Sequence, residues 1–174
     1  MMNSMKLKCV TPSPLGEILL VADGEGQALQ GLYLERQKYY PEHAGEWTPA
    51  PHLPLFRATI AQLREYFGGA RTAFDLPLAS EGTAFQRGVW AAIGGVPFGA
   101  TISYAELATR CGRPSAVRAA GAATGRNPLT IVVPCHRIMG SGGALTGYAG
   151  GLDRKRRLLD LEARVAAAAV RKVA

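Results

Sequence analysis

Short aliphatic segments separated by turn residues dominate the first part of the chain. Residues 16–23 (GEILLVAD) and 28–35 (ALQGLYLE) are rich in strand-forming residues, and the GEGQ between them is typical of a hairpin turn. The pattern therefore predicts two antiparallel strands. Residues 36–54 are rich in proline, glycine and charged residues, which predicts a surface loop.

The spacing of apolar residues becomes helical after residue 54. They recur at intervals of three and four, at Phe56, Ile60, Leu63 and Phe67, and two glycines follow at once. We therefore expect one helix in addition to the sheet. The polar stretch ASEGT marks the predicted boundary between an N-terminal sheet domain, residues 1–80, and a second domain, residues 81–174.

The second domain opens with two helix-start signals. Thr83 with Gln86, and Ser103 with Glu106, have the spacing of a capping box, and Gly112 suits the end of the second of these helices. A further short helix is predicted directly after it. Two short helices around a glycine-containing turn are typical of a helix-turn-helix, whose second helix contacts DNA in most DNA-binding versions.

The second helix of this pair, predicted over residues 114–127, has very few bulky side chains. Alanine and glycine fill most of it, and Arg118 projects alone among the alanines. Small residues favour close packing against another helix. They also suit a slim helix that enters a narrow groove with Arg118 as a cationic probe.

The rest of the chain combines an apolar run, a glycine-rich loop and a helix. LTIVV predicts a short strand that ends at Pro134. Residues 140–151 match no phosphate-binding loop, so we expect there either a mobile flap or backbone that approaches a ligand closely. The final helix, predicted from Asp153 to about Val170, has apolar residues along one face. Glu162 borders that face, where a carboxylate needs a partner.

The net charge of +7 is unevenly distributed along the chain. Residues 1–83 have 7 Lys and Arg against 9 Asp and Glu, a net charge of −2, whereas residues 84–174 have 13 against 4, a net charge of +9. A basic second half favours a polyanionic partner, with nucleic acid as the first candidate. The alternative is a basic face that serves only solubility.

Three widely spaced cysteines, Cys9, Cys111 and Cys135, form no CxxC pair. This spacing argues against a disulfide framework and a cysteine-rich zinc site, and favours a reducing, cytoplasmic location. No apolar run is long enough for a signal peptide or a membrane span, so no membrane association is expected. We predict neither a metal ion nor a cofactor.

Cys135 and His136 stand side by side in the sequence VVPCHR. A free thiol has a pKa of about 8.5 and needs a neighbouring base to become a nucleophile at neutral pH. Adjacent residues of a strand point to opposite faces, so the pair needs either a turn after Pro134 or a bridging water. Glu162 is the candidate to orient the imidazole. The alternative for Cys135 is an inert buried side chain.

Several motifs of the second half resemble the 6-O-alkylguanine-DNA alkyltransferase family. They are GTAFQRGVWAAIGGVPFGATISYAELA, RAAGAATGRNP, IVVPCHRIMG, GYAGG and LLDLE. PCHR after NP at this distance, with SYAEL upstream, is highly specific, whereas the first half resembles the family's sheet domain only in outline. The resemblance implies an α+β fold with a ribonuclease H-like N-terminal domain and a winged-helix-like C-terminal domain that contains the helix-turn-helix.

The resemblance also implies direct repair of double-stranded alkylated DNA, bound through its minor groove by a monomer. An alkyl group on the 6-oxygen of guanine, or on the 4-oxygen of thymine, would pass irreversibly to Cys135. His136 would take the thiol proton through a water, with Glu162 orienting the ring. Tyr104 would lie near the rotated phosphate and donate a proton to the departing guanine. Asn127 would hold the active-site turn together.

The damaged base must leave the duplex before it can react, and the resemblance assigns residues to this step. Arg118 would fill the gap that the base leaves. The DNA contacts would come from Tyr104, Ser115, Arg118, Ala119, Gly121 and Arg126. The pocket for the flipped base would be formed by Ile138, Tyr148, Ala149 and Gly150.

The chain departs from the family pattern at several positions. Some members have serine where this chain has Ala149, and some have proline where it has Thr130. Others bind zinc through N-terminal residues, whose spacing Cys9, His43 and His52 do not match.

Three alternative functions remain from the sequence. The family includes proteins that bind alkylated DNA without repairing it, but they have tryptophan in place of the cysteine. A cysteine hydrolase would need a site that stabilises an oxyanion and would turn over repeatedly. A helix-turn-helix transcription factor would recognise the major groove with polar side chains, which the alanine-rich helix lacks.

Overall fold

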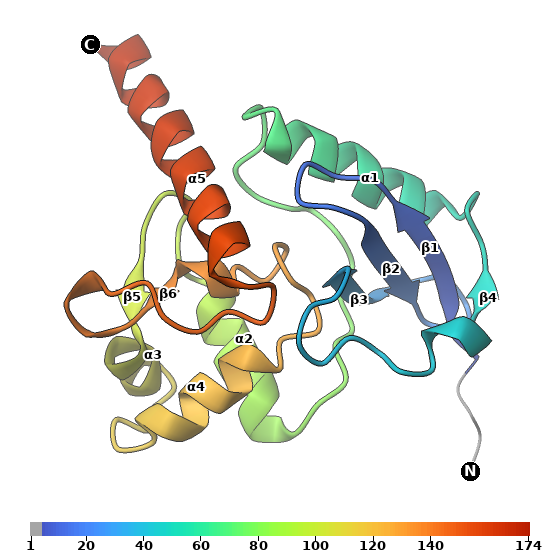
Figure 1. The fold of residues 1–174 in the computed structure, drawn as a ribbon, viewed down its shortest axis with the longest axis horizontal. Helices are drawn as coiled ribbons and strands as arrows, with labels where there is room; N and C mark the ends of the chain where they lie inside the picture. The colour runs from blue at the N-terminus through green and yellow to red at the C-terminus, as the bar shows by residue number, and fades with distance from the viewer. Residues whose placement is uncertain (1–4) are drawn as a thin grey trace. The chain divides into compact units, whose positions relative to one another are not determined.

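The computed structural model describes residues 5–174, which form two compact units (Figure 1). Unit 1 comprises the chain up to Glu81 together with Pro128–Thr130. Unit 2 comprises Gly82–Asn127 and Ile131–Ala174. Within the described range, every helix is too short or too polar to cross a membrane.

Unit 1 is built on a four-stranded sheet with the order β3-β2-β1-β4. Strands β2 (Ile18–Ala22) and β3 (Leu29–Leu34) form the predicted antiparallel hairpin. Strand β1 (Leu7–Thr11) pairs antiparallel with β2, and the two-residue β4 (Thr48–Pro49) pairs parallel with β1. Strands β1 and β4 were not predicted, because β1 contains a lysine and β4 lies in a loop rich in proline and glycine. That loop also contains a short 3-10 helix, Ala44–Glu46.

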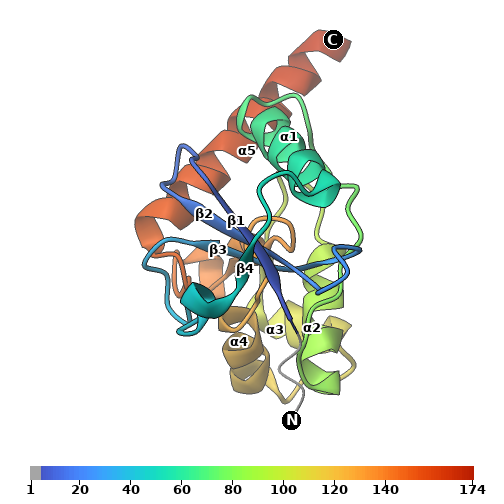
Figure 2. The same cartoon turned by 90° about the vertical axis from the view of Figure 1, so that its right-hand side faces the viewer.

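Helix α1 (Pro54–Phe67) lies along one face of this sheet (Figure 2). Its side chains Phe56 and Tyr66 are fully buried, as are Ile18 and Leu20 of the sheet. Burial of one large apolar side chain stabilises a fold by about 1.5–3 kcal/mol, so this layer provides the core of unit 1. The helix ends at the predicted glycines, with Gly69 in the left-handed region at φ 79°.

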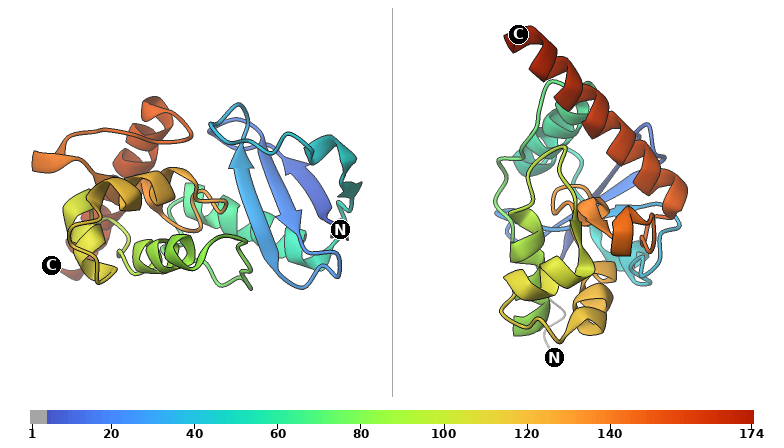
Figure 3. Two further views of the ribbon diagram at one scale, coloured as in Figure 1. Left: turned by 90° about the horizontal axis from the view of Figure 1, so that it is seen from below. Right: turned by 90° about the vertical axis from the view of Figure 1, so that its left-hand side faces the viewer.

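Unit 2 begins with three helices, α2 (Ala84–Gly94), α3 (Tyr104–Arg110) and α4 (Val117–Gly125) (Figure 3). The predicted capping box of α2 is present in full, with Thr83 and Gln86 each bonding the other's backbone N–H. The Trp90 indole of α2 donates to the Ala123 carbonyl of α4 at 2.8 Å. Helix α4 also packs against α3, and these two helices form the predicted helix-turn-helix.

The rest of unit 2 brings distant segments together. Strands β5 (Ile102–Ser103) and β6 (Ile138–Met139) pair in parallel, and 3-10 turns cover Cys135–Arg137 and Ser141–Gly143. Helix α5 (Leu152–Val173) is longer than predicted, and its last turns extend away from α2, α3 and α4 (Figure 1).

The strand predicted for LTIVV is wrong. Residues 129–133 form no strand and make only isolated bridges, one of them from Leu129 to Leu32. Ile131 has a positive φ of 74°, which is incompatible with an extended strand. A short apolar run cannot by itself distinguish a strand from a buried turn.

Candidate active site

Cys135 lies in a turn that starts directly after Pro134, as one of the two sequence interpretations required. The side chain is 4% exposed. The Asn127 side-chain amide donates to the Cys135 Sγ at 3.1 Å and to the Val133 carbonyl at 2.8 Å. Asn127 therefore closes the turn and offers a hydrogen bond to the sulfur, an arrangement that favours a thiolate over a thiol.

His136 follows in the same turn and is completely buried. Its Nε2 lies 2.7 Å from Oε1 of Glu162, whereas Nδ1 is buried without a protein partner among the described residues. A carboxylate accepts only, so the neutral ring has its proton on Nε2 and leaves Nδ1 as an acceptor. Burial lowers the pKa of His136, partly offset by Glu162. The ring is therefore a neutral base at physiological pH.

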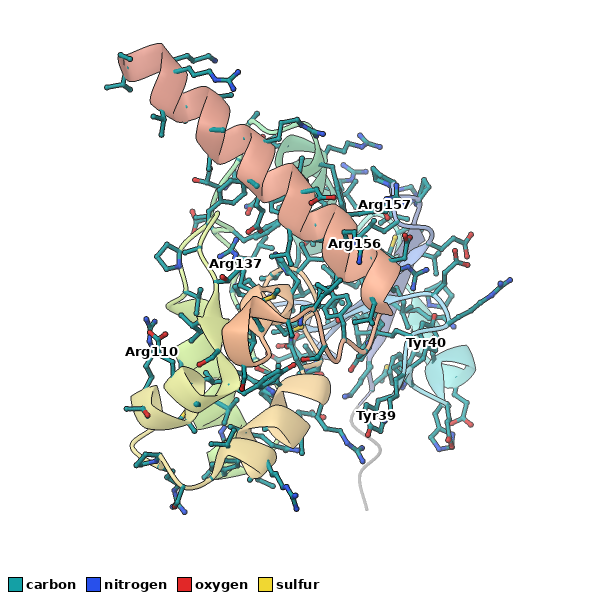
Figure 4. The ribbon with its side chains drawn as sticks, turned by 60° about the vertical axis from the view of Figure 1, so that its left-hand side comes forward. Tyr39, Tyr40, Arg110, Arg137, Arg156 and Arg157 are labelled. Carbon is teal, nitrogen blue, oxygen red and sulfur yellow. The ribbon has the colours of Figure 1, made fainter. Side chains whose placement is uncertain are left out.

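Glu162 also receives a forked pair of hydrogen bonds from Arg137. Arg137 Nε is 2.9 Å from Oε2 and Nη2 is 2.8 Å from Oε1, while Nη1 donates to the Val96 carbonyl (Figure 4). Burial alone would raise the pKa of Glu162, but the bonds from His136 and Arg137 outweigh it and lower the pKa to about 2. A permanent carboxylate thus fixes the imidazole.

Lys155 is a member of this site that the sequence analysis missed. It is fully buried, and its Nζ donates to the carbonyls of Ile138 at 2.5 Å, Thr146 at 2.7 Å and Gly147 at 3.2 Å. Burial lowers the pKa of Lys155 to about 8, with the charge of Cys135 acting in the opposite sense. The signal was its position seven residues before Glu162, on the same face of α5.

Opposing effects act on the Cys135 thiol. Burial raises its pKa, while the Asn127 hydrogen bond and then the Lys155 charge lower it. Burial is the largest of these effects, so the free protein holds mainly a thiol that needs a base to remove its proton.

Tyr104 begins α3, and its hydroxyl donates to the Gly147 carbonyl at 3.3 Å. A Cβ added at Gly121 of α4 would be 3.7 Å from the Tyr104 ring, so the ring lies against the helix-turn-helix. Burial, followed by the charge of Cys135, raises the pKa of Tyr104 and keeps the phenol protonated. The phenol thus lies between α4 and the glycine-rich loop.

The glycine-rich loop, residues 140–151, contributes the remaining predicted pocket residues. Tyr148, Ala149 and Gly150 are half-buried, and Lys155 ties the loop to Ile138 by its bonds to Thr146 and Gly147. The Ile138 N–H donates to the Cys135 carbonyl, and the Ile138 carbonyl already accepts from Lys155. The backbone group that Ile138 can still offer to a flipped base is therefore the second lone pair of its carbonyl oxygen.

The predicted DNA contacts lie on one exposed side of the helix-turn-helix. Ala120, Ala123 and Thr124 form the buried face of α4. Ser115, Arg118, Ala119 and Arg126 are exposed, and Gly121 is half-buried. Arg110 at the end of α3 is paired with Glu106 at 2.6 Å.

Metal-binding geometry is lacking in residues 5–174, where no group of three or more His, Cys, Asp and Glu side chains is arranged to hold an ion. The site contains a buried thiol, a neutral imidazole with a fixed carboxylate, a buried ammonium group and a phenol.

Comparison with family models matches both units of the chain. Residues 7–80 match the ribonuclease-like domain of 6-O-methylguanine DNA methyltransferase, and residues 84–164 match its DNA-binding domain. A methylated-DNA–protein-cysteine methyltransferase of Mycobacterium bovis is 47% identical over 86% of this chain and 88% of its own length. One from Methanosarcina barkeri is 45% identical over 88% of this chain and 94% of its own.

Solved structures agree with the sequence relatives. The crystal structure of Mycobacterium tuberculosis OGT in complex with DNA has a TM-score of 0.83 and 44% identity, covering 91% of this chain and 94% of that one. The crystal structure of the O6-methylguanine methyltransferase of the same organism also has a TM-score of 0.83.

Proposed function

This chain belongs to the 6-O-methylguanine DNA methyltransferase family, and we propose that it repairs DNA by moving an alkyl group from the 6-oxygen of guanine onto Cys135. Transfer of an alkyl group from DNA to a protein cysteine is the activity for which its relatives are named, and this chain has it. The observation that supports Cys135 as the acceptor is the hydrogen bond to its sulfur from Asn127, next to the buried His136–Glu162 pair.

Proton removal from Cys135 is the first requirement of the transfer. We assign it to Nδ1 of His136, reached through one bridging water, because Nδ1 is the ring's acceptor while Nε2 bonds Glu162. The carboxylate then stabilises the imidazolium that forms, in the way an acidic residue supports histidine in other nucleophilic sites.

The thiolate attacks the alkyl carbon, forming a carbon–sulfur bond as the bond from that carbon to the guanine 6-oxygen breaks. The electron pair of the broken bond leaves with guanine. Tyr104 donates a proton to the departing base, consistent with the raised pKa that keeps its phenol protonated. The thioether has no easy leaving group, so the protein reacts once and is consumed.

Access to the base requires that it be flipped from the duplex, at a cost of a few kcal/mol. We propose that α4 enters the minor groove, that Arg118 fills the vacated space, and that Ser115, Ala119, Gly121 and Arg126 contact the strand. The exposed face of α4 consists mainly of alanine, which suits a narrow groove. The flipped base would lie against Ile138 and the glycine-rich loop. One such site per chain needs no partner subunit, so we propose a monomer.

Radiolabelled methyl groups on a guanine-alkylated duplex test this proposal. The wild-type protein should take up one methyl group per molecule and then stop. A Cys135→Ser variant should take up none but still bind the duplex, and Cys111→Ser should behave like the wild type. Repeated turnover, or full uptake by Cys135→Ser, would exclude Cys135 as the acceptor.

A further inference from the structure

A three-residue segment of the second half belongs to unit 1. Pro128–Thr130 joins unit 1, although the chain before and after it belongs to unit 2. The Leu32 N–H donates to the Pro128 carbonyl at 2.8 Å, and the Thr130 N–H donates to the Leu32 carbonyl at 3.1 Å. The segment thus pairs with β3 through an isolated parallel bridge, with Leu129 fully buried.

The side chain of Gln37 binds the end of this segment. Its Oε1 accepts from the Leu34 N–H at 2.7 Å and from the Thr130 hydroxyl at 3.2 Å. Gln37 is only 6% exposed, although it lies in the loop predicted to be on the surface. Arg36, in the left-handed region at φ 59°, turns the chain so that the amide points inward.

The two residues that flank Pro128–Thr130 lie close to the acceptor cysteine in the chain or in space. Asn127 directly precedes it and donates to the Cys135 sulfur. Ile131 directly follows it at φ 74°, a strained conformation for a β-branched residue that persists only where the surroundings enforce it. The contacts that hold residues 128–130 in place therefore also hold the start of the segment that leads to Cys135.

We propose that Gln37 is a positioning residue for alkyl transfer, acting through its hydrogen bond to Thr130 on the chain segment between Asn127 and Ile131. This inference rests on the proposed role of Cys135 as acceptor. It gives unit 1 a part in the reaction through backbone continuity, without any contact between Gln37 and the DNA or the alkyl group. Thr130 provides the other side chain of this bond.

Thr130→Val tests the hydrogen bond between Thr130 and Gln37 alone. The substitution removes the Thr130 hydroxyl but keeps the shape of the side chain, and Gln37 can still accept from the Leu34 N–H. The measurement is the single-turnover rate of Cys135 methylation at saturating methylated duplex, below the Tm of every variant. We expect a loss of about 3- to 10-fold in rate, the effect of one buried hydrogen bond, with the Kd for DNA unchanged. Thr130→Ser, which keeps the hydroxyl, should restore the rate.

A double-mutant cycle with Gln37→Leu separates positioning from stability. The double variant should be no slower than the slower single variant, because both remove the same bond. Gln62→Leu is the matched control, since the Gln62 amide bonds the Asp75 backbone twice in unit 1 and lies on α1, not on β3 or in residues 128–130. It should lower the Tm but leave the rate unchanged.

The outcomes distinguish this inference from the proposed function. If Cys135 of the wild-type protein takes up no methyl group, the proposed function itself is wrong. If the wild type is labelled and Thr130→Val reacts at the wild-type rate, or Thr130→Ser is as slow as Thr130→Val, the positioning role of Gln37 is wrong. Fully additive losses in the cycle would also overturn it.

Discussion

At the scale of single residues, the site depends on two opposite charges that α5 buries on one face. Glu162 was predicted from its place beside the apolar stripe, because a carboxylate there requires a partner. Lys155 is buried on the same face of α5 but was not predicted, and its neighbours Arg156 and Arg157 are exposed. Sequence periodicity does not reveal which of these cations meets three inward-pointing carbonyls.

Glu162→Gln should destabilise the protein by roughly 3–5 kcal/mol at neutral pH, because it leaves the buried Arg137 guanidinium without its counter-charge. The folded-state pKa of about 2 lies below the ordinary 4.5, so the unfolded chain takes up the proton first as the pH falls. The stabilisation by Glu162 is thus complete above pH 4.5 and is lost toward pH 2.

Urea unfolding at a series of pH values measures this difference. The difference in free energy of unfolding between the wild type and Glu162→Gln should become smaller as the pH falls below about 4.5. Glu106→Gln, which alters an exposed pair with Arg110, serves as the control and should change stability little. A difference in free energy of unfolding that stays constant down to about pH 2 would contradict the stabilising role of the Glu162 carboxylate.

Lys155→Met removes the cation whose charge lowers the pKa of Cys135. We expect the apparent pKa of the methylation rate to rise and the rate at pH 7 to fall by about tenfold, since a nearby opposite charge shifts a pKa by about 1 unit or more. The measurement is the pH profile of single-turnover methylation. Lys172→Met, in the exposed last turn of α5, should leave the profile where it is; an equal shift in both variants would refute a local effect.

At the scale of elements, local signals were predictive and long-range ones were not. The capping box of α2 and the glycine end of α1 depend on neighbours within four residues, so the sequence indicates them directly. The run LTIVV was misassigned because its partner, Leu32, is far away in the chain and pairs with a single residue. The glycine-rich loop, expected to be mobile, is tied to Ile138 by Lys155, which no local pattern shows.

Helix α4 provides the element-scale test of DNA entry. Arg118→Ala should slow repair of methylated duplex by at least about tenfold, because the extruded base is no longer replaced, a step worth a few kcal/mol. Reaction with free benzylguanine, which needs no flipping, should change far less. Arg171→Ala, an equal loss of charge in the last turn of α5, is the control and should affect neither substrate. Equal losses on both substrates for Arg118→Ala would remove the gap-filling role.

At the scale of the whole molecule, sequence motifs identified the site and its neighbours, but not the path of the chain that supports it. PCHR, Asn127 and the α5 carboxylate lie together in unit 2, as the family resemblance implied. Pro128–Thr130 returns to unit 1 through backbone bonds to Leu32 and a bond to Gln37, a buried amide in a loop with no periodic pattern. Such a contact has no sequence signature, because glutamine in a polar loop is ordinarily exposed.

Mass spectrometry of the protein after incubation with excess methylated duplex tests the central claim most directly. The account predicts that the intact mass rises by one methyl group and then stays constant, and that peptide mapping places the methyl group on Cys135 alone. A methyl group on Cys9 or Cys111, or DNA demethylated in excess over protein while Cys135 remains unmodified, would contradict it.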